Sequence, residues 1–584
     1  MDVAKPEAPR YGSDVMVDLM RGLEIPYVTL NPGASFRGLH DSLVNRLGAP
    51  EIILCPHEKL AVQIAHGYTK ASGKTMAAVL HDTVGLLHGS LGIFNAYVDR
   101  TPVLVFGGAG PMDTTRRRPW IDWVHTSNIQ GNAVRDFTKW DDQPASVAAM
   151  PEAFARARRV AETEPAGPVY IGLDADLQER RLEGPIEGIA WDRVGPASRM
   201  GADPAALATA VRALGDAARP LILASYAGRD PRAFGWIPTL AEVVGAGIID
   251  MEDRLNAPNR HRLNVTESDA VADADVILLL DVKDASRFTM EVEQSTRNVR
   301  SRLAPGVRVI DIGFNELHTS SWSHHHGALP VTDIAITADT SVVLPQIIEQ
   351  IQVLVAMDSP ARAAEREARR GALAELHEQR LADWAAEAEK RRDERPVSPP
   401  RLAAEVWEAI RNYDWVLTAG TADGWATRLW DFDRPYRHAG KSLGTATQIG
   451  LSLGVALAHR DMGKLVVNLQ PDGDLLFDAA ALWIATANRI PMLVVMYNNR
   501  AYYNDWDHQI HMAKHRGSDL AKAHVGVAIE DPPPDFAALA RSFGWHAEGP
   551  IEDPDAIGDA VRRAAKIVME EGRPALVDVV CSHR

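Results

Sequence analysis

Two oxygen-bearing side chains follow two apolar segments in the last part of the chain. Asp472 comes shortly after residues 465–469, and Asn499 comes 27 residues later, shortly after residues 492–497. Both segments are rich in β-branched residues and predict buried parallel strands, with a helix at 478–488 between them. Because ligands of open α/β sheets bind at the carboxyl ends of strands, we expect both side chains in one crevice.

A divalent cation that carries a diphosphate suits this set of groups. Mg²⁺ prefers oxygen ligands in an octahedron and takes few of them from protein. Asp472 would give a carboxylate oxygen, Asn499 an amide oxygen and Ala501 its backbone carbonyl. Gly473 would let the chain approach the phosphates, and the N–H groups of the helix start would face them. Each motif alone could be an ordinary turn, but their combination across one βαβ unit favours a metal site.

The spacing resembles the signature of thiamine diphosphate enzymes, in which Gly-Asp-Gly is followed at a similar distance by Asn-Asn. The resemblance is to the superfamily of acetolactate synthase, pyruvate oxidase and benzoylformate decarboxylase, and it covers nearly the whole chain. It implies thiamine diphosphate and Mg²⁺ as cofactors. Two positions depart from the signature, since Pro471 replaces its leading glycine and Asp474 stands where a small residue is common. A further carboxylate beside a diphosphate is repulsive unless it points away or touches the metal, so Asp474 is the doubtful member of the predicted cofactor-binding set.

Glu58 is the residue that the resemblance assigns to cofactor activation. Residues 57–74, HEKLAVQIAHGYTKASGK, are similar to the stretch of the pyrimidine-binding domain that carries a single glutamate. A carboxyl group whose pKa is raised by an apolar site can exchange a proton with the ring nitrogen of the cofactor. The alternative is that Glu58 only favours a helix N-terminus. The metal motif elsewhere in the chain favours the catalytic assignment.

Two further contacts with the cofactor are implied by resemblance. Residues 418–425, TAGTADGW, resemble the loop that touches the diphosphate, and Thr421 has the hydroxyl group for it. Residues 441–458 resemble the stretch that carries a bulky aliphatic side chain under the bent cofactor, and Leu443 matches that position. An ordinary core leucine remains an equal alternative for Leu443.

The substrate side is predicted in the first part of the chain. Residues 31–35, NPGAS, are similar to a loop of benzoylformate decarboxylase that carries a serine after the glycine; Ala34 holds that place here and Ser35 follows it. His81 lies 23 residues after Glu58 and matches a catalytic histidine of that enzyme. A histidine can move protons near neutral pH. A histidine of the core or of a loop remains the alternative.

The segment after Asn499 is expected to roof the site. Asp505 matches the place of a glutamate in pyruvate decarboxylases and could move protons. Tyr503 and Trp506 would shape the acceptor pocket, or they could simply pack against neighbours. The cluster of Ser323 with the histidines at 324–326 lacks the spacing of a metal site and is interpreted as a polar loop.

The elements that must position these residues alternate between strand and helix. Strands are expected at 52–54, 76–80, 103–107 and 169–173, with helices at 57–73 and 89–97, which is typical of a doubly wound domain. The fold class is therefore α/β, with three doubly wound parallel-sheet domains of the thiamine diphosphate enzyme type. We expect a pyrimidine-binding domain at 1–185, a central domain at 200–356, a helical linker at 357–397, and a diphosphate- and Mg²⁺-binding domain at 398–584.

Composition limits the class of function. The 584 residues carry a formal charge of −16, with 46% hydrophobic and 24% charged residues. This acidity disfavours nucleic acid and anionic membranes as partners. Cys55 and Cys581 are too few for a disulfide framework. With neither a signal peptide nor an apolar span evident, we expect a cytoplasmic protein.

The resemblance implies a lyase or transferase that acts on a small 2-oxo acid or a related carbonyl compound, as a decarboxylase or carboligase. It also implies a homodimer or homotetramer with active sites at the subunit interface. Three alternatives stay open: an FAD-containing oxidase or synthase, a 2-hydroxyacyl-CoA lyase, and a catalytically silent regulatory subunit. The central segment has no Gly-x-Gly-x-x-Gly motif, so FAD is possible but unsupported by motif.

Overall fold

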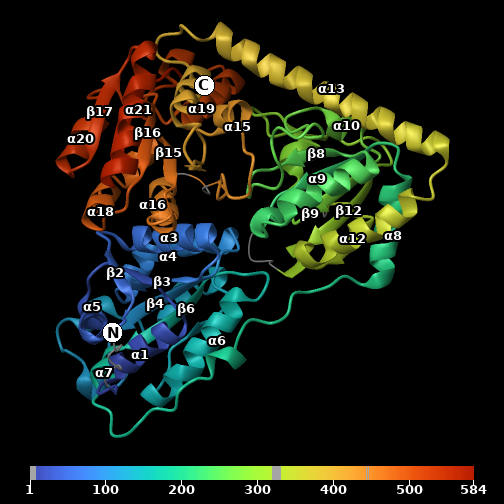
Figure 1. The fold of residues 1–584 in the computed structure, drawn as a ribbon. Coiled ribbons are helices and arrows are strands. Elements are labelled where there is room, and N and C mark those ends of the chain that lie inside the picture. Colours follow the sequence, from blue (N-terminus) through green and yellow to red (C-terminus); the bar gives the residue numbers. More distant parts are fainter. Residues whose placement is uncertain (1–7, 318–329, 442–443, 445, 584) are drawn as a thin grey trace.

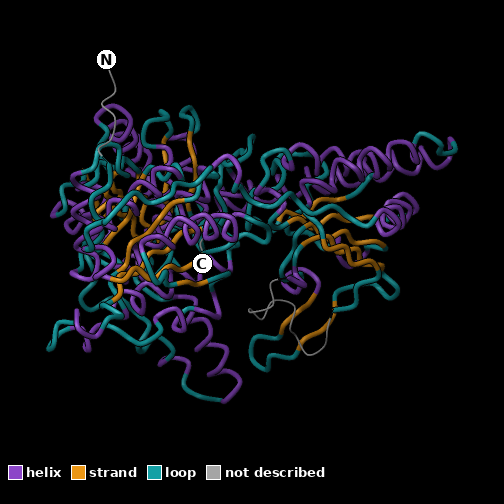
Figure 2. Tube along the Cα trace, turned by 90° about the horizontal axis from the view of Figure 1, so that it is seen from below, coloured by secondary structure: helices purple, strands orange, loops and turns teal. Residues whose placement is uncertain are grey.

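The structure is a computed structural model that describes residues 8–317, 330–441, 444 and 446–583. Leu443, Ser323 and the histidines at 324–326 lie outside the described residues. Within them, parallel sheets flanked by helices form the cores of three domains (Figure 1). Figure 2 shows the strands from below, enclosed by the helices that cover them. The predicted α/β fold class is confirmed.

The first domain contains a parallel sheet in the order β2-β1-β3-β4-β6-β5. Its strands are β1 (Tyr27–Leu30), β2 (Glu51–Leu54), β3 (Met76–Leu80), β4 (Val103–Ala109), β5 (Asp141–Asp142) and β6 (Val169–Asp174). The helices are α1 (Gly12–Gly22), α2 (Arg37–Asn45), α3 (Glu58–Ser72), α4 (Thr83–Val98), α5 (Asp122–His125), α6 (Met150–Glu162) and α7 (Ala175–Glu179). Helix α4 begins six residues earlier than predicted, directly after His81 and Asp82.

The central domain has the sheet order β13-β12-β9-β7-β8. The strands are β7 (Pro220–Ala224), β8 (Gly247–Asp250), β9 (Val276–Leu280), β12 (Arg308–Gly313) and β13 (Ile334–Thr337), beside a hairpin of β10 (Met290–Val292) and β11 (Val299–Ser301). The helices are α8 (Pro204–Asp216), α9 (Ala233–Val244), α10 (Ala270–Asp273), α11 (Ser286–Thr289) and α12 (Thr340–Val355). Helix α13 (Pro360–Lys390) then runs past this domain toward the last one (Figure 1).

The last domain has the sheet order β14-β15-β16-β18-β17. The strands are β14 (Trp415–Thr418), β15 (Leu465–Pro471), β16 (Leu493–Asn498), β17 (His546–Ile551) and β18 (Ala575–Val580). The helices are α14 (Pro399–Ile410), α15 (Gly424–Leu429), α16 (Gln448–His459), α17 (Asp472–Phe477), α18 (Ala481–Ala487), α19 (Tyr503–Arg516), α20 (Phe536–Ser542) and α21 (Pro554–Glu571).

The predicted helix at 478–488 is wrong in its extent, because two short helices occupy this stretch. Pro471, which has an extended backbone and a fixed φ, precedes the first turn of α17, so the helix starts at Asp472 itself. The backbone leaves the helical region at Asp478, whose side chain pairs with Lys59 of α3 at 2.7 Å. Helix α18 resumes three residues later.

Helices α3 and α16 hold the first and last domains together. Their side chains belong to one apolar core that also includes residues of both sheets. A Cβ atom on Gly67 would lie 2.1 Å from the carbonyl oxygen of Leu451, and one on Gly454 would lie 2.1 Å from that of Ile64. The glycines are therefore required for the close approach of the two helices. In the described part of the chain, no helix combines the length and apolar character needed to span a bilayer.

Candidate active site

The structure brings the two predicted metal side chains together at one sheet edge. Strands β15 and β16 are parallel neighbours, with Pro471 opposite Tyr497. The backbone N–H of Ala501 donates to Asp472 Oδ2 at 3.2 Å and to Asn499 Oδ1 at 3.1 Å. A carboxylate oxygen and an amide oxygen therefore accept from one shared N–H group and lie close together, which is the arrangement that two ligands of one cation require.

Asp472 is a buried carboxylate that no described cationic side chain neutralises. It is 2% exposed, and burial raises its pKa to about 6 although the N–H groups of Gly473, Ala501 and Arg500 donate to it. A desolvated carboxylate gains most from a nearby cation. The described residues contain no cluster of three or more His, Cys, Asp or Glu side chains that could hold a metal. A set of one carboxylate, one amide and one carbonyl fits Mg²⁺, which completes its octahedron with phosphate and water.

Gly473 has two close contacts within the protein. Its N–H donates to Asp472 Oδ1 at 2.8 Å, so this donor is already used inside the protein. A Cβ atom at this position would lie 2.5 Å from the ring of Tyr502. The absence of a side chain lets α17 pack against Tyr502, which leads into α19.

Asp474 points away from the metal side chains. One of its oxygens accepts from the N–H of Ala446 and the other accepts from Gln470 Nε2 at 2.9 Å. Burial raises the pKa of this carboxyl, which is 8% exposed. Ala446 has a left-handed φ of 64°, and its carbonyl accepts from Gln63 Nε2 of α3 at 2.8 Å. The unexpected carboxylate thus holds the turn before α16, and both of its oxygens accept hydrogen bonds from the protein.

Thr421 lies at the same end of the sheet. It is exposed in the loop after β14, and β14 is the parallel neighbour of β15. The predicted diphosphate loop and the predicted metal side chains therefore share one edge. The prediction for Leu443 falls outside the described residues.

Glu58 is the first residue of α3 and is 4% exposed. Its Oε2 lies 3.3 Å from Nδ1 of His88 on α4. A Cβ atom on Gly85 would lie 3.0 Å from Glu58 Oε1 and 2.7 Å from Cβ of His81. Glu58 and His81 therefore flank one glycine, and the absence of its side chain leaves room for both.

His81 follows β3 and lies within hydrogen-bonding distance of both a donor and an acceptor. Its Nδ1 is 2.8 Å from the backbone N–H of Asp82 and 2.7 Å from the Oδ1 of the same residue. Nδ1 can accept from the N–H when it is bare and can donate to the carboxylate when it is protonated. The position therefore fits either tautomer of the ring, which suits a histidine that moves protons.

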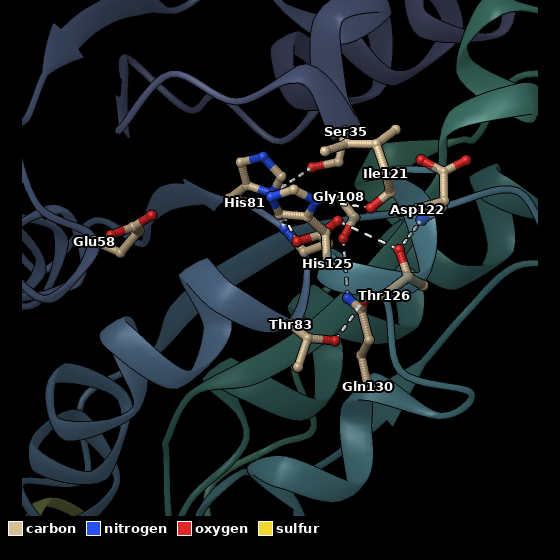
Figure 3. A network of polar contacts seen from close by, with 12 residues as sticks. Ser35, Glu58, His81, Thr83, Gly108, Ile121, Asp122, His125, Thr126 and Gln130 are labelled. Carbon is tan, nitrogen blue, oxygen red and sulfur yellow. Dashed lines mark hydrogen bonds and ion pairs between the residues drawn. The ribbon is translucent and has the colours of Figure 1, made fainter. Parts of the chain in front are cut away.

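Ser35, and not Ala34, faces this histidine. Ser35 is 2% exposed, with its Oγ 3.3 Å from His81 Nδ1, whereas Ala34 is exposed. Figure 3 shows Ser35 beside the ring of His81, while Glu58 lies further away at the end of its helix. The two predicted pocket residues of this loop thus have different environments, which their order in the sequence does not reveal.

His125 was not predicted. Its ring stacks on that of His81 with centroids 5.3 Å apart and an interplanar angle of 24°. It lies in the stretch IDWVHTSN, which has no recognisable motif. No signal in the sequence could have paired two histidines from different loops.

Helix α19 contains the remaining predicted residues. Asp505 is exposed in its first turn. Tyr503 and Trp506 pack on His583, the first stacked with ring centroids 4.5 Å apart and the second edge-on at 5.0 Å. His583, which was also not predicted, follows β18 and thus reaches the same sheet edge as the metal side chains.

The groups lie in two sets within one chain. In its described part, no hydrogen bond or ion pair joins Glu58 or His81 of the first domain to Asp472 or Asn499 of the last. The first set is a buried carboxyl group beside histidines, and the second is a buried carboxylate beside an amide oxygen.

Comparisons with known proteins find matches to both of these domains. Residues 10–132 match the family described as thiamine pyrophosphate enzyme, N-terminal TPP binding domain, and residues 418–579 match the C-terminal TPP binding domain. A probable acetolactate synthase 2 of Oryza sativa is 24% identical over 99% of this chain and 84% of its own length. The acetolactate synthase large subunit of Lactococcus lactis is 24% identical over 100% of this chain and 94% of its own.

Solved structures share the fold over almost the whole chain. A thiamine diphosphate-dependent 4-hydroxybenzoylformate decarboxylase of Rhodococcus jostii has a TM-score of 0.76 at 18% identity, covering 98% of this chain and 99% of its own. A benzoylformate decarboxylase of Polynucleobacter necessarius has a TM-score of 0.76 at 17% identity with the same coverage, 98% and 99%. At this level of identity the likeness shows the fold alone.

Proposed function

Because the chain belongs to the superfamily of thiamine diphosphate-dependent enzymes, we propose that it is a thiamine diphosphate- and Mg²⁺-dependent decarboxylase or carboligase of 2-oxo acids. One observation carries the proposal most directly. Asp472, a buried carboxylate without a described cationic partner, shares the N–H of Ala501 with the amide oxygen of Asn499. The names of the relatives, acetolactate synthases, support the same class of reaction.

The residues of the last domain would hold the cofactor. Asp472, Asn499 and the carbonyl of Ala501 would bind Mg²⁺, and Thr421 would contact the diphosphate. When bound, thiamine diphosphate supplies the electron sink for cleaving or forming the bond next to a carbonyl. The protein would contribute position and exclusion of water, because the polar ends of β15 and β16 are buried.

The residues of the first domain would move protons. Glu58, buried at the start of α3, would hold or release a proton at the pyrimidine ring. His81 would give a proton to, or take one from, the substrate oxygen, since its Nδ1 can be bare or protonated. Ser35 would orient a substrate group beside this histidine. Asp505, exposed on α19, is the second candidate for proton transfer, and Tyr503 and Trp506 would line the acceptor side.

We also propose a homodimer or homotetramer in which the first domain of one chain faces the last domain of another. Helix α4 supports this arrangement, because it carries an exposed apolar stripe beside the Glu58–His88 contact. Its members Val84, Leu87, Leu91 and Phe94 are 37%, 55%, 41% and 42% exposed. Their spacing puts them on one face of the helix, and such a face is typical of a protein interface. A two-fold pairing would complete two equal sites. A cytoplasmic location is part of the same proposal.

A flavin-containing oxidase is disfavoured by the central domain. The ligand crevice of an open α/β sheet lies where the strand order reverses, here between β7 and β9. The turn Asp99–Arg100 of the first domain occupies this place. Arg100, 2% exposed, pairs with Asp281 after β9, and Asp99 accepts from the hydroxyl of Tyr226 after β7 at 3.1 Å. The crevice is therefore filled by the chain itself.

The remaining alternatives differ in measurable ways. A 2-hydroxyacyl-CoA lyase would act on thioesters, and a silent regulatory subunit would turn over no substrate. The presence of Glu58, Asp472 and Asn499 argues against a silent subunit. Purified protein, supplied with thiamine diphosphate and Mg²⁺, should be screened against 2-oxo acids with and without aldehyde acceptors. Aldehyde as product identifies a decarboxylase, and a 2-hydroxy ketone or 2-hydroxy acid identifies a carboligase.

The decisive variant is Glu58→Gln. It keeps the shape of the side chain and removes the acid, so cofactor affinity measured by calorimetry should stay within about threefold while turnover falls by roughly 10²-fold or more. Glu548→Gln, a change in an ion pair of strand β17, is the matched control and should keep full turnover. Equal turnover in Glu58→Gln and wild type would refute the assignment.

A further inference from the structure

His125 is a second histidine at the predicted proton-transfer site, and the proposed function does not use it. It is the last residue of α5, and its ring lies 5.3 Å from that of His81 at an angle of 24° (Figure 3). Its neighbours on the chain are apolar or small, so nothing in the local sequence requires a histidine there. The question is what the stacked ring does for His81.

The hydrogen bond of His125 fixes which of its nitrogens carries a proton. Nδ1 lies 2.9 Å from the carbonyl oxygen of Ile121, which can only accept. Nδ1 must therefore carry the proton, and Nε2 of the neutral ring is bare. A bare Nε2 is a proton acceptor. His81 is not restricted to one tautomer. Its Nδ1 lies at similar distances from the backbone N–H of Asp82, which donates, and from the carboxylate oxygen of Asp82, which accepts.

Asp82 contacts His81 and the residue that follows His125. It is 1% exposed; its Oδ1 lies 2.7 Å from His81 Nδ1, and its Oδ2 accepts from the hydroxyl of Thr126 at 3.3 Å. One buried carboxylate thus lies beside the histidine pair, and one carboxylate balances one positive charge. The pair is suited to hold a single extra proton, because two cationic rings in contact would repel each other.

Hydrogen bonds to other parts of the first domain anchor the segment that carries His125. The N–H of Ser127 donates to Thr83 Oγ1 at 2.8 Å, and Gln130 Nε2 donates to the carbonyl of Gly108 at 2.9 Å. On the outer side, Trp120 and Trp123 are 77% and 76% exposed. The contacts that fix this segment are therefore those that hold His125 over His81.

We propose that His125 is a positioning residue for proton transfer by His81. It holds the ring of His81 by stacking, and its bare Nε2 offers a second place for the proton that His81 gives to or takes from the substrate. The proposal rests on the proposed function, because it assigns a role within that same site.

The reaction offers a way to isolate the proton-transfer step. Formation of an aldehyde, R–CO–COO⁻ + H⁺ → R–CHO + CO₂, needs a proton from the site. With ferricyanide as a one-electron oxidant, the same acid gives R–COO⁻, CO₂ and two protons from water, and two ferricyanide ions are reduced. The oxidative branch releases CO₂ without protonating the carbon. The two rates, measured on one enzyme, separate bond cleavage from proton delivery.

The variant His125→Phe keeps a flat ring against His81 and removes both nitrogens. We expect its aldehyde formation to fall by about 10²-fold, while CO₂ release with ferricyanide stays within about threefold of wild type. His125→Asn, whose amide can still donate to the carbonyl of Ile121, should show the same split. His546→Phe on β17 is the matched control and should change neither rate. Equal loss of both rates in the two His125 variants would overturn the proposal, because it would indicate a purely structural role.

A second readout needs neither cofactor nor turnover. Ring ¹⁵N shifts of the apoprotein should show Nδ1 of His125 protonated and Nε2 bare at neutral pH, and His125→Phe should move the His81 signals whereas His546→Phe should not. A protonated Nε2 with bare Nδ1 on His125 would overturn the proposal. If the wild type itself turned over no 2-oxo acid, the proposed function would fail and this role with it. That failure appears in the wild type, whereas failure of the inference alone appears only in the variants.

Discussion

The contact between Asp474 and Ala446 gives the sharpest test of how this chain builds its cofactor site. Ala446 has a φ of 64°, a left-handed conformation that costs a residue with a side chain roughly 1–2 kcal/mol. Its N–H donates to Asp474 and its carbonyl accepts from Gln63 Nε2 at 2.8 Å. Asp474 therefore holds a strained turn at the start of α16, next to the stretch predicted to support the cofactor.

The variant Asp474→Ala removes this support. It leaves the buried N–H of Ala446 without its acceptor and removes one of the two acceptors of Gln470 Nε2, at a cost of about 2 kcal/mol. If the turn at Ala446 must be ordered for the cofactor to bind, this cost lowers the fraction of protein molecules that can bind it. The apparent Kd for thiamine diphosphate with Mg²⁺ should then rise by roughly 30-fold. Because Gly adopts the left-handed region freely, Ala446→Gly should return about 1 kcal/mol and bring the double variant to about fivefold above wild type.

Titration calorimetry on the four proteins of this cycle measures the coupling directly. Hydrogen exchange of the Ala446 amide gives a local control, since protection should fall in Asp474→Ala and partly recover in the double variant. Ala446→Gly alone should bind the cofactor within about twofold of wild type. The reasoning is refuted if Asp474→Ala binds as tightly as wild type, or if Ala446→Gly fails to recover any affinity in its background.

Two further predictions follow from the same structure. The double variant Leu87→Glu, Leu91→Glu on the exposed stripe of α4 should be monomeric in light scattering and should lose turnover. Met357→Glu, at a position 80% exposed near α13, should leave the oligomeric state and turnover unchanged. A double variant that stays oligomeric and active would contradict the proposed interface. Burial raises the pKa of Asp578 in β18 to about 6, so the folded state binds this proton more tightly than the unfolded state does. The protonated carboxyl therefore stabilises the folded state fully below pH about 4, and this stabilisation is lost as the pH rises through 6. Asp578→Asn should therefore melt at a higher temperature than wild type at pH 7.5 but not at pH 4.5; a difference between the two proteins that does not change with pH would show that this carboxyl does not titrate in that range.

Much of the fold was accessible from the sequence because its signals are local. Apolar β-branched segments such as 465–469 predicted strands, and the helix of Glu58 was placed within one residue at its start. The error in helix extent came from a contact between distant parts of the chain. The stretch 478–488 reads as one helix, but Asp478 leaves the helical region to pair with Lys59 of another domain, a partner that periodicity cannot reveal.

What the sequence by itself determined is the set of chemical groups and the strand ends on which they lie. Asp472 and Asn499 had to meet, because parallel strands joined by one crossover bring their carboxyl ends to one edge. The tertiary structure alone decided where individual side chains point: Ser35 rather than Ala34 toward His81, Asp474 toward Ala446, and His125 onto the ring of His81. These side-chain orientations depend on contacts between residues that are distant in the chain. Such contacts produce no periodic pattern in the sequence, so the sequence alone does not reveal them.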